Sequence, residues 1–299
     1  MVGSAVAKLA RSQSIEVEGK SSKELDLTER FLVYKELKNI RPDVLVISAA
    51  KVGGIKQNVT FPVDFLSENL QIQTNLLDAA HEAGVKRVLF LGSSCIYPKF
   101  AQQPIKEEFL LSGPLEPTNA AYAIAKIAGI KLVESYRKQY KHSWISIMPT
   151  NLYGPGDNFD SESAHVLPAL INKFHKAKVE NHPKVSLWGD GSALREFLYV
   201  DDLAEAILLL LAQYDCSAPI NVGSGQEISI RDLAAVVSAT VGYSGGIEFG
   251  ENTLNGTPRK LLDSSKIASL GWIPKTSLTL GVEQTYSWFV KQNTESRVN

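Results

Sequence analysis

The sequence contains a tyrosine and a lysine at a spacing that permits proton transfer. Tyr122 and Lys126 are four residues apart, which places the phenol and the ammonium on one face of a helix. A nearby cation favours the phenolate, so we expect Lys126 to lower the pKa of Tyr122 and to make it a better proton donor and acceptor. Tyr34 and Lys38 have the same spacing, and we interpret that pair as a solvated helix face.

The surroundings of Tyr122 in the sequence add further polar groups. Ser93 and Cys95 directly follow an apolar run at residues 88–91, and the triplet Pro-Thr-Asn at 149–151 follows a second run. In open α/β sheets, ligands bind beyond the carboxyl ends of the strands. We therefore expect these residues to meet Tyr122 at one site.

Apolar runs alternate with helical patterns over about the first 220 residues. The expected strands are residues 15–17, 44–47, 88–91, 145–148 and 220–222. The expected helices between them lie near residues 27–37, 65–83 and 121–140, and the chain is expected to be helical almost from Met1. Such alternation predicts an α/β fold, a Rossmann-type doubly wound parallel sheet.

The pattern loosens after Asn151, where prolines and glycines become frequent. Helices are expected at residues 203–213, 230–241 and 278–291. We expect residues 1–160, with about 195–225, to form a dinucleotide-binding domain. Residues 161–194 and 226–291 are expected to form a smaller α/β substrate-binding lobe, and 292–299 a frayed polar tail.

Composition excludes several classes of protein. The 299 residues include 31 basic and 32 acidic side chains, and the net charge of -1 gives no general attraction to nucleic acid or to an anionic membrane. The longest apolar run, residues 204–212, is far shorter than the roughly 20 residues of a membrane span. With two cysteines and no recognisable signal peptide, the chain is expected to be soluble and cytoplasmic.

Longer motifs resemble one family of nucleotide-sugar enzymes. Ser93, Tyr122 and Lys126 resemble the catalytic triad of the extended short-chain dehydrogenase/reductases. The segments that are more specifically similar to the GDP-L-fucose synthase family are residues 49–55, 92–99, 116–119, 122–129, 149–155 and 256–263. The resemblance implies a bifunctional enzyme, a 3,5-epimerase and 4-reductase that converts GDP-4-keto-6-deoxy-D-mannose to GDP-L-fucose.

The same resemblance implies a role for each catalytic residue. Cys95 and His165 match the family's acid–base pair, and both side chains can titrate near neutrality to move protons at C3 and C5. At C4, Tyr122 would protonate the alkoxide and Ser93 would donate a hydrogen bond to it, as in an oxyanion hole. Lys126 would lower the pKa of Tyr122 and hold the nicotinamide ribose.

NADP is the cofactor that the resemblance implies. Lys20 and Ser22 follow the expected strand 15–17, where cations and hydroxyls accommodate a 2′-phosphate, although Glu18 argues for NAD. The expected cofactor-binding residues are Gly3, Lys20, Ser22, Leu91, Gly92, Ser93, Ser94, Lys126, Pro149, Thr150, Asn151, Leu152 and His165. The expected substrate-binding residues are Lys173, Trp188, Arg195, Asn255, Arg259 and Lys260, and no metal site is expected.

Two alternative chemistries are less favoured by these residues. A 4,6-dehydratase of this superfamily carries an Asp-Glu pair just after the serine, whereas residues 94–97 contain no carboxylate. A plain 4-epimerase would need neither Cys95 nor His165 as an acid–base pair. The alternatives that stay open are another epimerase or reductase of the same family and a non-catalytic remnant that keeps a dimerisation surface.

The family carries Gly-x-x-Gly-x-x-Gly between its first strand and first helix, and Gly3 matches the third glycine. We therefore expect the first strand and two glycines to be absent from this chain. Either the natural chain is longer by roughly a dozen residues, or a short chain binds cofactor weakly and is poorly stable. Extended reductases pair through two helices per subunit, here 65–83 and 121–140, so a homodimer is expected.

Overall fold

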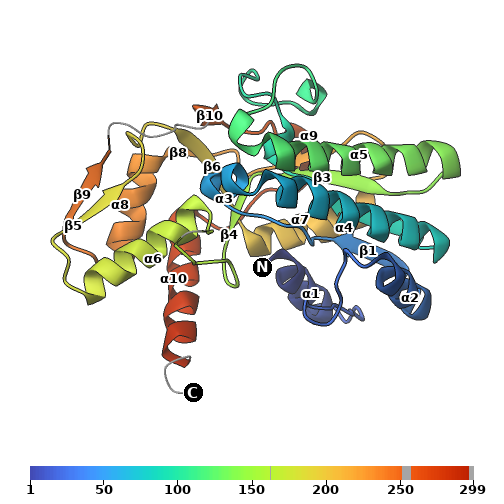
Figure 1. Cartoon of the computed structure of the whole chain (residues 1–299), viewed down its shortest axis with the longest axis horizontal. Coiled ribbons are helices and arrows are strands. Elements are labelled where there is room, and N and C mark those ends of the chain that lie inside the picture. The colour runs from blue at the N-terminus through green and yellow to red at the C-terminus, as the bar shows by residue number, and fades with distance from the viewer. Residues whose placement is uncertain (162, 251–256, 296–299) are drawn as a thin grey trace.

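A four-stranded parallel sheet forms the centre of the larger part of the molecule, with the strand order β1–β2–β3–β7 (Figure 1). The computed structural model describes residues 1–161, 163–250 and 257–295. The strands of this sheet are β1 (Val44–Ile47), β2 (Arg87–Leu91), β3 (Ile145–Pro149) and β7 (Ile220–Val222). The helices that cover it are α1 (Val2–Ser12), α2 (Arg30–Ile40), α4 (Pro62–Glu82), α5 (Ala120–Tyr140) and α7 (Val200–Gln213). The predicted fold class, a doubly wound α/β sheet, is confirmed.

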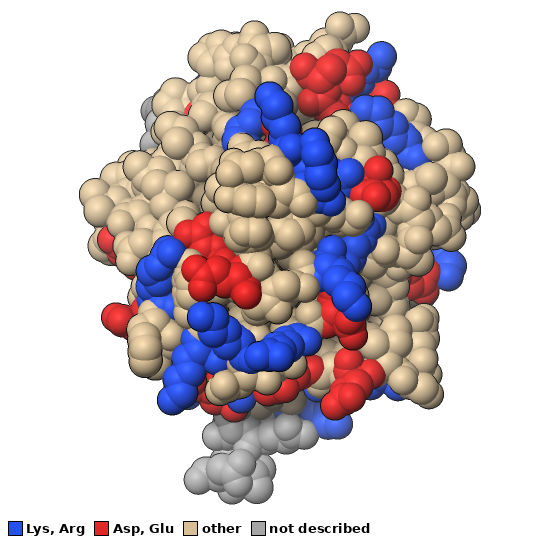
Figure 2. All heavy atoms as spheres, turned by 90° about the vertical axis from the view of Figure 1, so that its right-hand side faces the viewer, with Lys and Arg blue, Asp and Glu red and all other residues tan. Residues whose placement is uncertain are grey.

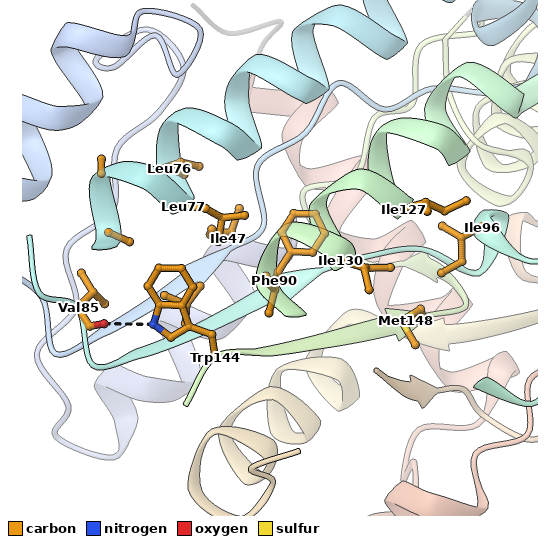
Figure 3. Close-up of a cluster of buried hydrophobic side chains, with 14 of the residues drawn as sticks. Ile47, Leu76, Leu77, Val85, Phe90, Ile96, Ile127, Ile130, Trp144 and Met148 are labelled. Carbon is orange, nitrogen blue, oxygen red and sulfur yellow. Dashed lines mark hydrogen bonds between the residues drawn. The ribbon is translucent and has the colours of Figure 1, made fainter. Parts of the chain in front are cut away.

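Successive residues of β2 show how the sheet builds two cores. Val88 and Phe90 belong to one apolar cluster, with α4 and α5, whereas Leu89 and Leu91 belong to the cluster on the opposite face, with α1 and α7. Side chains alternate across a strand, so an unbroken apolar run is what a strand covered on both faces requires. Figure 3 shows the first cluster, in which the indole of Trp144 donates a hydrogen bond of 3.2 Å to the carbonyl of Val85.

The first twenty residues follow the sequence prediction only in part. Helix α1 forms as expected and packs its buried Val6 against the core shared with α7. The prediction of a strand at residues 15–17 is wrong. Ile15 is 47% exposed, and the carbonyl of Val17 accepts a hydrogen bond from the Arg11 side chain rather than from a strand. A short apolar run becomes a strand only where another strand pairs with it.

A smaller lobe lies beside the central sheet and, among the described residues, contains two further sheets (Figure 1). Strand β6 (Leu194–Tyr199) pairs with three neighbours, which are β4 (Asn151–Tyr153), β8 (Glu227–Ser229) and β10 (Arg259–Lys260). The second pair is β5 (Lys184–Leu187) with β9 (Gly246–Phe249). The helices of the lobe are α6 (Val166–Val179), α8 (Ile230–Val241) and α10 (Leu278–Glu295).

A third core holds this lobe together, with Phe174 of α6 and Val237 of α8 fully buried in it. Helix α10 continues to Glu295, so residues 292–295 are helical and the expected frayed tail does not begin at residue 292. These residues form the last turn of a helix whose inner face packs on the third core. The remaining short elements are α3 (Ile55–Thr60), α9 (Ser265–Ser269) and the 3-10 turns Ser94–Ile96, Glu107–Phe109 and Pro117–Asn119.

Opposite charges are interspersed over the surface that Figure 2 shows. Ion pairs join α2 to α4, among them Arg30 with Asp78 at 3.0 Å and Lys38 with Glu82 at 3.4 Å. This mixing agrees with the net charge of -1. No helix in the described part of the chain is both long enough and apolar enough to cross a membrane.

Candidate active site

The carboxyl end of β2 places two polar side chains next to each other. The amide of Gly92 donates a hydrogen bond of 2.8 Å to the carbonyl of Ile147 in β3, so the chain stays close to the sheet beyond the strand. A Cβ at Gly92 would lie 3.0 Å from that carbonyl oxygen. Ser93 then caps the turn Ser94–Ile96 by accepting a 3.2 Å hydrogen bond from the amide of Cys95.

Lys126 lies beneath this turn on α5. Its Nζ donates a hydrogen bond of 2.7 Å to the carbonyl of Leu91 and lies 4.8 Å from the centre of the Phe90 ring. The residue is 3% exposed, and burial lowers the pKa of its ammonium to about 7. An ammonium has three donors, so Lys126 keeps donors for other hydrogen-bond partners.

Tyr122 lies one helical turn before Lys126 and faces Ser93 and Cys95. Burial raises the pKa of Tyr122, Cys95 raises it further, and a hydrogen bond with the Ser93 side chain partly opposes them. The prediction that Lys126 lowers the pKa of Tyr122 is therefore wrong in this structure. Lys126 Nζ bonds to Leu91 and lies 6.0 Å from the centre of the phenol ring. The phenol is protonated at neutral pH, as a proton donor must be.

Cys95 joins this group to charges from the smaller lobe. Lys260 Nζ lies 3.5 Å from Cys95 Sγ, and Arg195 acts on the same sulfur through its charge. Burial raises the pKa of Cys95, but Lys260, Ser93 and Arg195 together lower it by more, so the pKa lies below its ordinary value. The cluster therefore favours a thiolate, the form of cysteine that accepts a proton.

His165 precedes α6 as its N-cap residue and comes under the influence of the same lysine. Desolvation by the surrounding protein lowers the pKa of His165, and the charge of Lys260 lowers it further, although the residue as a whole is exposed. Lys260 thus acts on both members of the predicted acid–base pair. Ser93, Cys95, Tyr122, Lys126, His165 and Lys260 form one chain of contacts and charge interactions.

The loop before α3 fixes the approach to His165. The amide of Gly54 donates a 3.2 Å hydrogen bond to the carbonyl of Ser163, and a Cβ at Gly54 would lie only 2.9 Å from the carbonyl oxygen of Ala164. Asn58 donates hydrogen bonds to the carbonyls of Gly53 and Gly54, at 2.9 and 3.1 Å. Sequence analysis placed Gly53 and Gly54 in the family-like segment 49–55 but gave them no role, and it did not mention Asn58; the Gly-Gly pair followed by an asparagine was the available signal.

Glu196 is a second residue that sequence analysis missed. Its side chain is fully buried and accepts hydrogen bonds from the amides of Gly225 and Leu262, at 2.7 and 3.0 Å. Leu262 lies two residues after Lys260, so Glu196 helps to fix the backbone that carries the lysine. The available signal was a glutamate directly before the apolar run Phe197–Tyr199 of the same strand.

The residues predicted to bind substrate are placed differently from one another. Arg195 lies at the Cys95 cluster. Arg259 instead donates a 2.7 Å hydrogen bond to Glu227, and Lys173 donates one of 2.7 Å to the carbonyl of Ser186. Trp188 is 69% exposed, and Asn255 lies outside the described residues.

Besides Ser93, Lys126 and His165, the predicted cofactor residues lie in the first turn of α1, in the segment after α1, and at the carboxyl ends of β2 and β3. Gly3 begins α1 beside the end of β1, where a Cβ would lie 3.0 Å from Ser48 Oγ. Lys20 forms ion pairs with Glu18 and Glu36 at 3.4 and 3.2 Å, and Ser22 is exposed close by in sequence. Leu91 ends β2, Gly92 follows it, and Ser94 begins the next turn. Pro149 ends β3, Thr150 follows it, and Asn151 and Leu152 begin β4.

The other Tyr-x-x-x-Lys pair has no comparable surroundings. Tyr34 and Lys38 lie on α2, where the ammonium pairs with Glu82 at 3.4 Å and both side chains of that ion pair are about half exposed. The prediction of a solvated helix face is confirmed for Lys38 but not for Tyr34, which is half-buried against the first apolar cluster. Spacing alone therefore did not distinguish the two pairs, whereas the strand ends beside Tyr122 did.

The sequence was compared with models of known protein families. The model of the NAD dependent epimerase/dehydratase family matches residues 1–223. The chain belongs to that family.

Among curated relatives, GDP-L-fucose synthase 1 of Arabidopsis thaliana is 54% identical over 97% of this chain and 90% of its own length. GDP-L-fucose synthase of Escherichia coli is 46% identical over 99% of this chain and 96% of its own length. Within the larger family, the chain therefore belongs to the GDP-L-fucose synthases.

Solved structures agree at the level of the fold and the family. A GDP-L-fucose synthetase of Naegleria fowleri bound to NADP is 30% identical with a TM-score of 0.90, covering 98% of this chain and 90% of that one. A GDP-6-OMe-4-keto-L-xylo-heptose reductase of C. jejuni is 33% identical with a TM-score of 0.92, covering 98% and 95%.

Proposed function

We propose that this chain converts GDP-4-keto-6-deoxy-D-mannose to GDP-L-fucose by epimerisation at C3 and C5 and reduction at C4. The observation that carries the proposal is the position of Cys95 between two sets of groups. On one side lie Ser93 and Tyr122, which suit ketone reduction, and on the other lie Lys260 and His165, which suit proton transfer at carbon. A reductase without epimerase activity needs only the first set.

Epimerisation requires a base and an acid that can reach the carbon atoms next to the ketone. The Cys95 thiolate removes a proton: the C–H bond breaks, an S–H bond forms, and the electron pair moves to the C4 oxygen as an enolate. On the opposite face, the imidazolium form of His165 gives its proton to the carbon, and the enolate becomes a ketone again. The proton on Cys95 is then lost to solvent and His165 takes one from solvent, which restores the thiolate and the imidazolium; His165 is an exposed residue and can exchange protons with water.

Reduction uses the first set of groups. When bound, NADPH supplies the hydride that reduces C4. Tyr122, which burial keeps protonated, gives its proton to the oxygen that becomes an alkoxide. Ser93 donates a hydrogen bond to the same oxygen, and this bond strengthens as negative charge develops.

The residues present fit a dinucleotide. Lys126 is a buried ammonium that donates one hydrogen bond to the carbonyl of Leu91, and its further donors suit ribose hydroxyls. The first turn of α1, with Gly3, suits the diphosphate because helix amides there lack intrahelical acceptors. Lys20 and Ser22 suit the 2′-phosphate of NADP, although the phosphate must compete with acidic side chains for the lysine.

The test of this function uses GDP-4-keto-6-deoxy-D-mannose and NADPH in D2O. We expect stoichiometric oxidation of NADPH and a GDP-L-fucose product that carries deuterium at C3 and C5 by NMR. A reduced sugar with the original configuration and no deuterium would show a simple 4-reductase. A Cys216→Ser variant is the control, because Cys216 is an exposed cysteine outside the site.

We further propose that the chain forms a homodimer through α4 and α5. These two helices pack against each other and carry exposed apolar side chains, including Val63, which is 73% exposed, and Ile124, which is 48% exposed. Light scattering on wild type and on Val63→Asp should give a dimer and a monomer. Val179→Asp, on the exposed end of α6, is the matched control and should stay dimeric.

The proposed location is the cytoplasm. Cys95 and Cys216 are both unpaired, and the proposed chemistry requires Cys95 as a free thiol or thiolate. A reducing compartment preserves that state. Fractionation of cells that express the chain should recover it with cytoplasmic markers.

A further inference from the structure

The position of Lys260 is fixed on both sides by buried backbone contacts. Strand β10 pairs with β6 so that Lys260 stands opposite Arg195. After the lysine, the amide of Leu261 donates to the Gln103 side chain at 2.9 Å, and the amide of Leu262 donates to Glu196 at 3.0 Å. The lysine that meets Cys95 therefore belongs to a framework and is not a chance contact of a surface loop.

Strand geometry separates Lys260 from the cation beside it. Successive side chains of a strand point to opposite faces, so only one of two neighbours can face Cys95. Lys260 Nζ lies 3.5 Å from Cys95 Sγ, whereas Arg259 pairs with Glu227 at 2.7 Å. Arg259 and Lys260, which sequence analysis assigned together to substrate binding, thus have different environments.

The groups that act on Cys95 include more positive than negative charge. They are Lys260 of β10, Arg195 of β6, Tyr122 of α5 and Ser93 of its own turn, and His165 before α6 shares Lys260. Tyr122 and Ser93 are neutral at pH 7, and desolvation keeps His165 mostly neutral. Glu116 acts on Arg195 and pairs with Lys99 at 2.9 Å. Lys260 and Arg195 both lower the pKa of Cys95, and the thiolate form of Cys95 is the anion that these cations stabilise.

We propose that Lys260 is the counter-ion of the Cys95 thiolate and holds the sulfur ready to accept a proton before substrate arrives. This inference rests on the proposed role of Cys95 as the base of the epimerisation. Lys260 itself neither gains nor loses a proton. When Cys95 takes the proton from carbon, negative charge leaves the sulfur for the enolate oxygen of the substrate, and the ammonium loses its anionic partner. Lys260 is thus a positioning residue that acts through Cys95.

The first test measures the rate at which iodoacetamide alkylates Cys95 as a function of pH, in a Cys216→Ser background. Lys260→Met should move the midpoint of the profile to higher pH, and alkylation at pH 7 should slow by about tenfold for each pH unit by which the midpoint rises. Lys260→Arg should keep the wild-type midpoint, because it keeps the charge. Arg259→Met is the matched control from the same strand and should leave the midpoint unchanged. An unshifted midpoint in folded Lys260→Met would overturn the proposal.

A second measurement follows from the shared action of Lys260 on His165. A cation disfavours the imidazolium, so its removal should raise the NMR titration midpoint of His165 in Lys260→Met and not in Arg259→Met. Thermal melts show whether each variant is folded. If Lys260→Met does not fold, the alkylation profile of Lys260→Arg is used to test the proposal. In that case, the proposal is contradicted if the pH midpoint of Cys95 alkylation in Lys260→Arg rises to the value of a free cysteine.

Turnover distinguishes the counter-ion role from simple binding of the diphosphate. As a counter-ion, Lys260 affects deuterium exchange at C3 and C5 and shifts its pH profile, while reduction of an already epimerised ketone changes less. A lysine that bound only diphosphate would instead raise KM equally for both steps. Because alkylation needs no substrate, a shifted midpoint with no epimerisation would keep the ion pair and reject the proposed function.

Discussion

The two halves of the candidate site are assembled in different ways. The reduction group, defined as Ser93, Tyr122 and Lys126, comes from the end of β2 and from α5, which cover each other in one α/β layer. The proton-transfer group, defined as Cys95, His165 and Lys260, begins in the same turn but takes two of its members from the smaller lobe. The first group depends on local order, and the second depends on the placement of the two lobes.

This difference predicts that the two reactions can be separated by mutation. Changes at the end of β2 or on α5 act on reduction, whereas changes at contacts between the lobes act on proton transfer. Cys95 is the link, because it lies next to both groups. Substitutions that affect both reactions equally would contradict the division.

The largest effect is expected for Tyr122→Phe. Because burial keeps the phenol protonated, the variant loses the proton donor for the alkoxide and should reduce the ketone about 100- to 10,000-fold more slowly. Deuterium exchange at C3 and C5 should persist, since Cys95 and His165 are untouched. Single-turnover oxidation of NADPH measures the first step and NMR measures the second. Equal loss of both would reject the role of Tyr122.

Cys95→Ser tests the other half of the comparison. A hydroxyl in place of the thiolate is a far weaker base at neutral pH, so exchange at C3 and C5 should slow by about 100-fold or more. Reduction of a ketone that is already epimerised should change much less, because the amide of residue 95 still donates to Ser93 Oγ. If both steps slowed to the same extent, Cys95 would only position the substrate.

The sequence predicted the reduction group more completely than the proton-transfer group. Strands β1 and β2 and helices α4, α5 and α8 lie within a few residues of their predicted bounds, because apolar periodicity reports local burial. Ser93, Tyr122 and Lys126 meet as a direct consequence of those elements. Their proximity therefore needed no information from distant parts of the chain.

Other features depend on contacts that periodicity does not record. The contact of Lys260 with Cys95 joins residues 165 positions apart, and it required the register between β10 and β6. Arg259 and Lys260 were predicted to share one role, substrate binding. A two-residue strand is too short for the sequence to show that their side chains point to opposite faces. The direction of the Tyr122 pKa shift was missed because burial and Cys95 raise this pKa, whereas Lys126 donates its hydrogen bond to the Leu91 carbonyl.

Gly54→Ala tests whether the position of His165 affects proton transfer more than reduction. The new Cβ would lie 2.9 Å from the carbonyl oxygen of Ala164, so the segment before His165 must shift. We expect deuterium exchange to fall by about tenfold, which is less than the roughly 100-fold that a misplacement of about 1 Å can cost, while reduction of an epimerised ketone stays near wild type. Gly19→Ala, where no atom lies within 4 Å of the new Cβ, is the control. A larger effect on reduction than on exchange would contradict this placement of His165.

The smallest effect concerns stability and the buried lysine of the reduction group. Burial lowers the pKa of Lys126 from 10.5 to about 7. Between these values the unfolded chain binds more protons than the folded one, so the stability of the wild type rises with pH through this interval, by on the order of 1 kcal/mol per pH unit. Lys126→Met removes this dependence.

Urea unfolding at several pH values between 7 and 10.5 measures that dependence. As the pH rises, the free energy of unfolding of the wild type should increase relative to that of Lys126→Met. Lys131→Met, an exposed lysine of the same helix paired with Glu134, should keep the wild-type pH slope. If the free energy of unfolding had the same dependence on pH in wild type and Lys126→Met, the buried ammonium would stay protonated between pH 7 and 10.5. The reduction group would then carry a fixed positive charge beside Tyr122, and cofactor binding that depends on Lys126 would not weaken as the pH rises through 7.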